Sequence, residues 1–190
     1  MSNKKNKKIL LHCCCAPCAA YVSELLGLTY DVSLFFYNPN IHPESEYQLR
    51  LKEIEHFAHF KEMNLIIGDY NVSEWLQDIK GYENEPECGK RCNICYYERF
   101  KKTAKVARRK KFDVWGTTLS ISPHKDAEAI NKIGRELKNK YKIDFLEADF
   151  KKNDGFKRSL ELSNQYNFYR QNYCGCLFSQ LPQINKSPHK

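Results

Sequence analysis

The sequence predicts an α/β fold, namely a single domain with a mostly parallel sheet of about five strands and helices on both faces. Short apolar stretches alternate along the chain with longer stretches in which apolar residues recur at helical spacing. This alternation is typical of parallel strands joined by crossover helices. The 190 residues are enough for one full hydrophobic core. Because no internal repeat, low-complexity segment or linker interrupts the pattern, we expect residues 1–190 to form one domain.

The first third of the chain predicts two strands, each followed by a helix. Residues 1–8 are a lysine-rich tail, and a strand is expected over about 8–13, where an apolar run leads into three adjacent cysteines. Pro17 favours the first turn of a helix and Gly27 favours a helix end, so we expect a helix between them. The next two expected elements are a strand at 31–37 and a helix at 43–63.

The rest of the chain continues the alternation. Ser122 and Pro123 are residue types favoured at the N-cap and the first turn of a helix, so we expect a helix to begin there. The spacing of Ile130, Ile133 and Leu137 supports that helix. In order, we expect a strand at 65–67, helices at 72–79 and 91–110, a strand at 114–118, the helix after Ser122, a strand at 142–147, a helix at 155–166 and a C-terminal tail over 178–190.

Composition excludes several classes of protein. There is no apolar run of the roughly 18 residues that a membrane span needs, and the lysine-rich start does not read as a signal peptide, so we expect a cytoplasmic protein without a membrane contact. The formal charge of +8 is compatible with a nucleic-acid partner but is weak support for one. Neither a G-x-G-x-x-G segment nor a P-loop follows the first strand. Electrons for any redox reaction would therefore come from a separate donor.

All nine cysteines fall into three groups along the chain. In a reducing cytosol, clustered cysteines indicate metal or redox chemistry rather than structural disulfides. The first group ends a strand, at the edge where open α/β sheets usually bind ligands. We therefore predict that the fold brings the three groups together. They are Cys13, Cys14, Cys15 and Cys18; Cys88, Cys92 and Cys95; and Cys174 and Cys176.

The first two groups indicate a metal centre. Cys92 and Cys95, near a helix start, place two sulfurs on one turn, and the Cys-Cys pair after the first strand can supply the other two ligands of a tetranuclear iron–sulfur cluster. Structural zinc is the main alternative, and it would make the protein a zinc-stabilised nucleic-acid-binding module without redox activity. A radical S-adenosylmethionine enzyme also uses the spacing of Cys88, Cys92 and Cys95. Those enzymes carry the motif early in a barrel-like fold, which makes that assignment less favoured here.

The Cys174-Gly175-Cys176 segment indicates a different chemistry. Two cysteines one residue apart can close only a small, strained disulfide ring, and strain makes a disulfide easier to reduce, as in catalytic pairs. Gly175 supplies the backbone freedom that such a ring needs. Metal ligation and free thiols remain alternatives. The aromatic and polar residues 169–173 suit a nucleoside-binding surface, or an ordinary segment packed on the domain.

Three further features carry weaker signals. Residues 101–111 hold seven basic residues and no acidic one, which fits either a solvated helix face or a contact with a phosphate backbone. His124 and Asp126 follow a strand end and are candidate proton donors or metal ligands, although Asp126 fits a helix first turn equally well. His12 precedes the cysteines and can be a plain strand residue.

Four segments in this order resemble the QueH family of epoxyqueuosine reductases, and the resemblance spans nearly the whole chain. They are Leu11-His12-Cys13-Cys14-Cys15-Ala16-Pro17-Cys18, Gly89-Lys90-Arg91-Cys92-Asn93-Ile94-Cys95-Tyr96, Thr117-Thr118-Leu119-Ser120-Ile121-Ser122-Pro123-His124-Lys125-Asp126 and Tyr169-Arg170-Gln171-Asn172-Tyr173-Cys174-Gly175-Cys176.

The resemblance implies a HUP-type, Rossmann-like fold and the last step of queuosine biosynthesis. In that step, the epoxide of epoxyqueuosine at the wobble position of tRNA loses its oxygen to give queuosine, with electrons from an external donor. The resemblance also implies a [4Fe-4S] cluster, and a second, mononuclear iron bound partly by an aspartate is consistent with it. By motif, the cluster ligands are Cys14, Cys15, Cys92 and Cys95, the redox-active disulfide is Cys174 with Cys176, and Asp126 is a catalytic acid or iron ligand.

Overall fold

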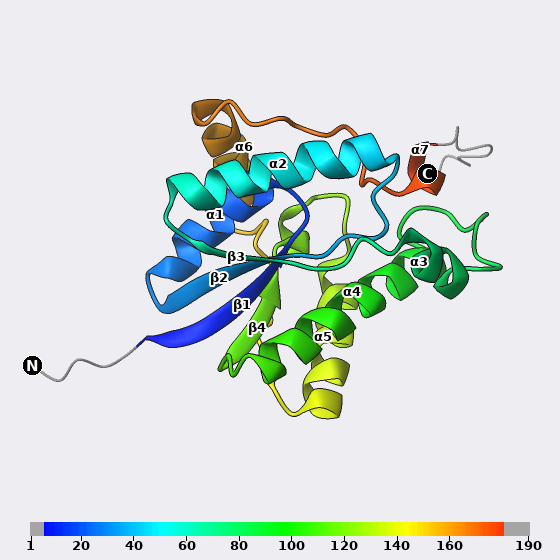
Figure 1. Cartoon of the computed structure of the whole chain (residues 1–190), viewed down its shortest axis with the longest axis horizontal. Helices are drawn as coiled ribbons and strands as arrows, with labels where there is room; N and C mark the ends of the chain where they lie inside the picture. The colour runs from blue at the N-terminus through cyan, green and yellow to red at the C-terminus, as the bar shows by residue number, and fades with distance from the viewer. Residues whose placement is uncertain (1–5, 181–190) are drawn as a thin grey trace, which may run out of the picture.

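Five parallel strands form one sheet, in the order β3-β2-β1-β4-β5, in the computed structural model, which describes residues 6–180. Figure 1 shows the sheet edge-on, with helices on both sides. The predicted fold class, a single α/β domain of Rossmann-like architecture, is therefore confirmed. The strands are β1 (Lys7–Cys13), β2 (Tyr30–Phe36), β3 (Asn64–Ile67), β4 (Val114–Thr117) and β5 (Asp144–Phe145).

The helices pack on the sheet in two layers (Figure 1). Helices α1, α2 and α6 cover one face, and α4 and α5 cover the other. Their bounds are α1 (Ala16–Gly27), α2 (Glu44–Phe60), α3 (Val72–Asp78), α4 (Lys90–Arg109), α5 (Ala127–Tyr141), α6 (Gly155–Gln165) and α7 (Leu177–Gln180), with a 3₁₀ turn, η1, at Leu119–Ile121. No helix within residues 6–180 has both the length and the apolar character needed to cross a membrane.

The central strand β1 explains the two layers. Because side chains alternate along a strand, Ile9, Leu11 and Cys13 enter the core under α1 and α2, whereas Leu10 enters the core under α4 and α5. Most of β1 is fully buried, as expected for the middle strand of a parallel sheet. The alternation also decides which thiols can reach which side of the sheet.

The strand order places a topological switch beside β1. After β1 the chain builds outward through β2 and β3, and then crosses to β4 on the other side. Connections leave β1 and β4 in opposite directions at that point, which opens a crevice at their carboxyl ends. The first cysteine group follows β1 directly and therefore lies at this crevice.

The structure differs from the prediction at the start of β1, at the last strand, in the C-terminal tail and at the start of α5. Lys7 lies in β1 rather than in a tail, because its backbone pairs with β2. The last strand is only Asp144–Phe145, because Lys142 takes a left-handed conformation that ends α5. The C-terminal helix α7 occupies part of the expected tail. Residues 1–5 and 181–190 lie outside the described residues.

The helix expected after Ser122 begins later, at Ala127. Its N-cap is Asp126, whose Oδ1 accepts hydrogen bonds from the backbone N–H groups of Glu128 and Ala129 at 2.9 and 3.1 Å. Ser122 instead accepts a hydrogen bond from the His124 N–H in a turn. Both residue types cap helices, but a cap with a carboxylate that satisfies two N–H groups is the stronger one.

Replacing Gly134 with alanine should destabilise the protein by about 1–2 kcal/mol. A Cβ at Gly134 of α5 would lie 2.1 Å from the buried ring of Phe145, and this overlap should cost more than the roughly 1 kcal/mol that alanine gains in a helix. Urea unfolding measures the change. Gly27→Ala adds the same methyl where no atom lies within 4 Å and should be neutral or stabilising. Equal free energies of unfolding for the two variants would contradict this packing.

Candidate functional site

The three cysteine groups line one inner cavity at the carboxyl ends of β1 and β4. Cys14 comes from the end of β1, Cys92 and Cys95 come from the first turns of α4, and Cys174 and Cys176 come from the C-terminal segment. The predicted convergence of the three groups is therefore confirmed. The other lining residues are Asn40, Trp75, Arg91, Tyr96, Arg99, Leu119 and Lys125.

The four predicted cluster ligands do not all reach this cavity. Cys14, Cys92 and Cys95 line it, whereas Cys15 is buried behind Cys14, with 3.9 Å between the two sulfurs. Within residues 6–180, no three Cys, His, Asp or Glu side chains meet around one point as a single metal ion requires. A four-iron cluster places its cysteine ligands on different irons, so its ligands are spread more widely.

The remaining thiols of these groups occupy different places. Cys13 points to the other side of the sheet, where its Sγ donates to the Phe35 carbonyl at 3.6 Å. Cys88 is exposed, and its Sγ donates to the His124 carbonyl at 3.1 Å. Cys18 lies in α1, one turn after Cys14. The structure thus separates Cys13 and Cys88 from the inner cavity and leaves Cys18 beside it.

Three cationic side chains surround the cavity, and the sequence did not single them out. Arg91 and Arg99 are almost fully buried, and Arg99 donates through Nε to the Cys95 carbonyl at 3.2 Å. Burial lowers the pKa of Lys125, but Tyr96 and Cys174 beside it raise the pKa more, so Lys125 stays an ammonium ion at neutral pH. Buried positive charge favours thiolates and anionic groups in this cavity.

The donor set therefore fits an iron–sulfur cluster in its chemistry. It offers thiols from separate elements and nearby cations that offset negative charge. The inner cavity is small, about 20 Å³, so a tetranuclear cluster requires its lining side chains to move apart. Burial also raises the pKa of Cys92 to about 11, and metal binding to this thiol would release its proton.

The Cys174-Gly175-Cys176 turn brings two unlike thiols together. The Cys176 N–H lies 3.4 Å from Cys174 Sγ, and Gly175 has φ +102°, a conformation that favours glycine. The hydrogen bond from the Cys176 thiol lowers the pKa of Cys174 well below its usual range, and the Lys125 charge lowers it further against the effect of burial. The same hydrogen bond and burial raise the pKa of Cys176. Of the two thiols, Cys174 thus carries a negative charge more readily.

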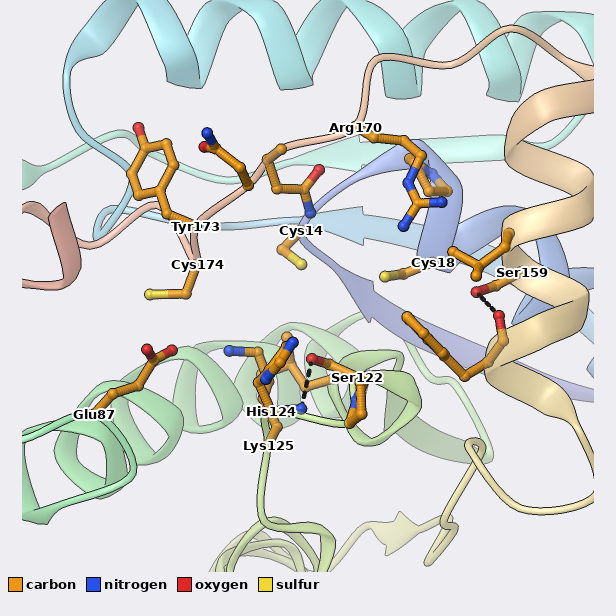
Figure 2. A pocket seen from close by; sticks show the side chains of 17 residues that line it. Cys14, Cys18, Glu87, Ser122, His124, Lys125, Ser159, Arg170, Tyr173 and Cys174 are labelled. Atoms are coloured by element: carbon orange, nitrogen blue, oxygen red, sulfur yellow. Dashed lines mark hydrogen bonds between the residues drawn. The ribbon is translucent and has the colours of Figure 1, made fainter. Parts of the chain in front are cut away.

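An outer cavity of about 440 Å³ opens next to the inner one. Figure 2 shows the side chains of Cys14, Cys18 and Cys174 around it, with Lys125 on the opposite wall from Tyr173. Of residues 169–173, predicted to form a nucleoside-binding surface, all but Tyr169 line one side. The cavity combines aromatic, amide and cationic groups, which suits a polar ligand with a planar ring. The other lining residues are Pro17, Glu87, Leu119, Ser122, Pro123, His124, Phe156, Ser159 and Leu160.

Asp126 lies apart from both cavities. It lines an open groove with Glu87, Cys88, Pro123, His124 and Lys125, and its Oδ1 is engaged as the cap of α5. The neighbouring residue, Lys125, lines both cavities, because the turn before α5 directs the two side chains differently. The motif that contains both residues indicated a functional segment, but spacing alone could not select the residue.

His12 is a structural residue, as the strand alternative predicted. Its side chain is fully buried, with Nδ1 3.0 Å from Thr117 Oγ1 and Nε2 3.2 Å from the Tyr37 carbonyl. Burial, with the charge of Arg99, lowers its pKa to about 3. His12 is therefore neutral at physiological pH and ties β1 to its neighbours.

The basic segment 101–111 occupies the far half of α4 and the turn after it. Lys101 pairs with Glu98, and Lys102 lies 2.6 Å from Asp69, so part of the positive charge is already neutralised. A helix rises about 1.5 Å per residue, so this segment begins roughly 9–14 Å along the helix from Cys95 and Cys92. None of residues 101–111 lines the inner or the outer cavity, so a phosphate bound to this segment would lie outside both.

Replacing Lys125 with methionine should raise the pKa of Cys174. A cation stabilises a nearby thiolate, so its removal makes Cys174 harder to deprotonate. The pH dependence of Cys174 alkylation by iodoacetamide, followed by mass spectrometry, measures the shift. Lys132→Met, an exposed change on α5, serves as the control. An unchanged pH profile in the Lys125 variant would show that this ammonium does not act on Cys174.

Comparisons with known proteins identify similar chains. The family model described as "Epoxyqueuosine reductase QueH" matches residues 9–181. A protein of that name from Acinetobacter baylyi is 44% identical over 90% of this chain and 80% of its own length. Others of that name are from Staphylococcus epidermidis, 41% identical over 93% of this chain and 77% of its length, and from Thermotoga maritima, 36% identical over 94% and 93%.

Proposed function

The chain belongs to the epoxyqueuosine reductase QueH family, and from this premise we propose that it reduces the epoxide of epoxyqueuosine in tRNA to give queuosine, using an iron–sulfur cluster and the Cys174/Cys176 pair. Members of the family are oxidoreductases by name. The observation that carries the proposal is the convergence of all three cysteine groups on one cavity beside a larger one that can hold a nucleoside.

The electrons and atoms of this reaction balance with a dithiol. Removing the epoxide oxygen forms a carbon–carbon double bond and water, and it consumes two electrons and two protons. Oxidation of the Cys174 thiolate and the Cys176 thiol to a disulfide releases two electrons and one proton, and the second proton comes from water. An external donor must then reduce the disulfide before the next turnover, because the sequence holds no G-x-G-x-x-G motif for a nicotinamide or flavin dinucleotide.

The protein's own residues prepare the pair for this task. The Cys176 thiol and the Lys125 ammonium favour the thiolate of Cys174, which makes it the more reactive sulfur. The raised pKa of Cys176 keeps its proton on the second sulfur until the disulfide forms. Lys125 lines both cavities, so its N–H groups can also donate to an oxygen that develops negative charge in the outer cavity.

A cluster held by Cys14, Cys92 and Cys95, with Cys15 as fourth ligand, would supply one-electron storage next to the pair. Arg91 and Arg99 lie beside these thiols and offset their negative charge. Asp126 stays a proposal as an acid or as a ligand of a second iron. Asp126 lines the open groove with Cys88 and Lys125, so either role requires the substrate or the second iron to reach into that groove.

We place the modified nucleoside in the outer cavity. Tyr173 offers a ring for stacking, and Arg170 and Gln171 offer hydrogen bonds from the same wall. The anticodon stem can extend from there toward the basic segment 101–111, whose cations would bind phosphates. This arrangement fits a cytoplasmic enzyme that acts on tRNA.

The deciding experiment combines metal analysis with a tRNA assay. Protein purified without oxygen should be brown and contain about four irons per chain besides any mononuclear iron, and it should convert epoxyqueuosine in tRNA to queuosine when given a reductant. Nucleoside digestion and mass spectrometry follow the loss of one oxygen. A colourless protein with stoichiometric zinc that binds tRNA without changing it would replace this proposal with the zinc-stabilised binding module.

A further inference from the structure

We propose that Arg50 and Glu46 of α2 form a positioning pair that holds the Cys174-Gly175-Cys176 turn and sets its thiol–disulfide equilibrium. This inference rests on the proposed redox function of that turn. The pair lies far from the turn in sequence, on a helix that carries none of the cysteines.

The Arg50 side chain is almost completely buried, at 1% exposure, and its hydrogen bonds go to the C-terminal segment and to Glu46. Its Nη1 donates to the Cys174 carbonyl at 3.2 Å and its Nη2 donates to the Tyr173 carbonyl at 3.3 Å. Its guanidinium also lies 5.4 Å from the centre of the Tyr173 ring. Two consecutive peptide groups are therefore anchored by one planar cation.

Glu46 orients this cation and anchors the same segment a second time. One oxygen accepts from Arg50 Nε at 2.7 Å, and the other accepts from the Tyr169 hydroxyl at 2.9 Å. Glu46 is itself buried, at 9% exposure. A buried ion pair is expensive to desolvate, and a nonpolar pair of similar size would fill the space. The hydrogen bonds that Arg50 and Glu46 make to residues 169, 173 and 174 explain why an ion pair is present here.

The loop before α2 completes the anchor. The Gly175 carbonyl accepts from the His42 N–H at 2.7 Å, and the Tyr173 hydroxyl donates to the His42 carbonyl. A Cβ at Gly175 would lie 2.8 Å from Ile41 and 3.3 Å from Arg50 Nη1. The backbone of all three residues 173–175 is thus fixed by hydrogen bonds from α2 and its preceding loop.

This anchor favours the reduced form of the pair. A turn with fixed carbonyls must close the small disulfide ring with little backbone freedom, which strains the disulfide. Without Arg50, the turn can relax around the disulfide, and the equilibrium should move toward the oxidised form.

The test measures the thiol–disulfide equilibrium of the full-length, cluster-loaded protein in dithiothreitol buffers of varied ratio. Alkylation and mass spectrometry of the tryptic peptide after Arg170, which contains both cysteines, report the oxidised fraction. The main variant is Glu46→Gln with Arg50→Met, which leaves no unpaired buried charge. We expect the equilibrium to shift at least about tenfold toward the disulfide, with unchanged iron content, lower kcat and unchanged KM.

Two further variants make the outcome decisive. Arg50→Lys keeps the charge but can reach only one carbonyl, so it should shift the thiol–disulfide equilibrium by an intermediate amount. Because no buried charge is lost, this variant should also fold more readily than one without the cation. Lys52→Met removes an exposed cation from the same helix and should change nothing. An equilibrium within about twofold of the original in both Arg50 variants, or a parallel loss of iron, would overturn the proposal. Failure of the unmodified protein to convert epoxyqueuosine would instead reject the function, since the thiol equilibrium is measured without substrate.

Discussion

Replacing Cys92 with alanine should remove the proposed iron–sulfur cluster and abolish turnover. Cys92 lines the inner cavity at the start of α4, one turn before Cys95 on the same side. A cluster that loses one thiolate of four loses a strong ligand at one iron, and the buried site offers water little access to replace it. The expected result is a loss of the brown absorption, of most of the bound iron and of detectable queuosine formation.

Cys88→Ala is the matched control for this change. It removes a thiol four residues earlier, which is exposed and faces the His124 carbonyl rather than the inner cavity. Iron content and turnover should stay close to those of the unmodified protein. If Cys88→Ala removes the iron and Cys92→Ala retains both iron and activity, the ligand assignment is one helical turn out of place, and the cluster scheme in its present form is wrong.

Replacing Cys176 with serine should stop catalysis while the iron remains bound. Serine cannot form the disulfide that closes each reductive cycle, so turnover should fall by at least about a thousandfold, the scale seen when an essential nucleophilic unit is broken. Cys174 would stay reactive, because Lys125 still faces it. Iron and sulfide analysis together with the tRNA assay separates the two effects.

The alternative role of Cys176 gives a clear opposite result. Cys176 lines the same inner cavity as Cys92 and Cys95, so ligation of a metal is sterically open to it. Loss of iron from Cys176→Ser would make this residue a ligand and would leave the reaction without its dithiol. Full activity with intact iron would exclude both roles. Cys88→Ser again tests whether any thiol-to-serine change disturbs the protein.

The fold could be predicted because its signals are local. The period of apolar residues and the turn residues near Pro17 and Gly27 identify most elements, and parallel strands separated by helices leave few possible arrangements. Predictions failed where two residues could do the same local task. Ser122 and Asp126 are both good caps, and the Asp126 carboxylate, which accepts from two backbone N–H groups, begins α5.

The site was predicted in outline through its thiols, since cysteine clusters are rare and chemically specific. The cations around them were missed, because Arg91, Arg99 and Lys125 belong to residue types that usually face solvent. Their burial depends on segments far apart in sequence. Three adjacent cysteines also do not reveal which one reaches the cavity, because a strand directs neighbouring side chains to opposite faces. Cys13 enters the core on the other side of the sheet, and Cys14 lines the cavity.

The convergence of the three cysteine groups also has a consequence for biogenesis. The segment that carries Cys174 and Cys176 is translated after the sheet and α4, yet it forms a wall of the cavity that Cys14 and Cys92 line. During synthesis, the sheet and α4 can form first, and their thiols then face solvent until this segment docks on α2 through Arg50. The proposed cluster would therefore have an open route to these cysteines before docking, and the docked segment would cover it afterwards.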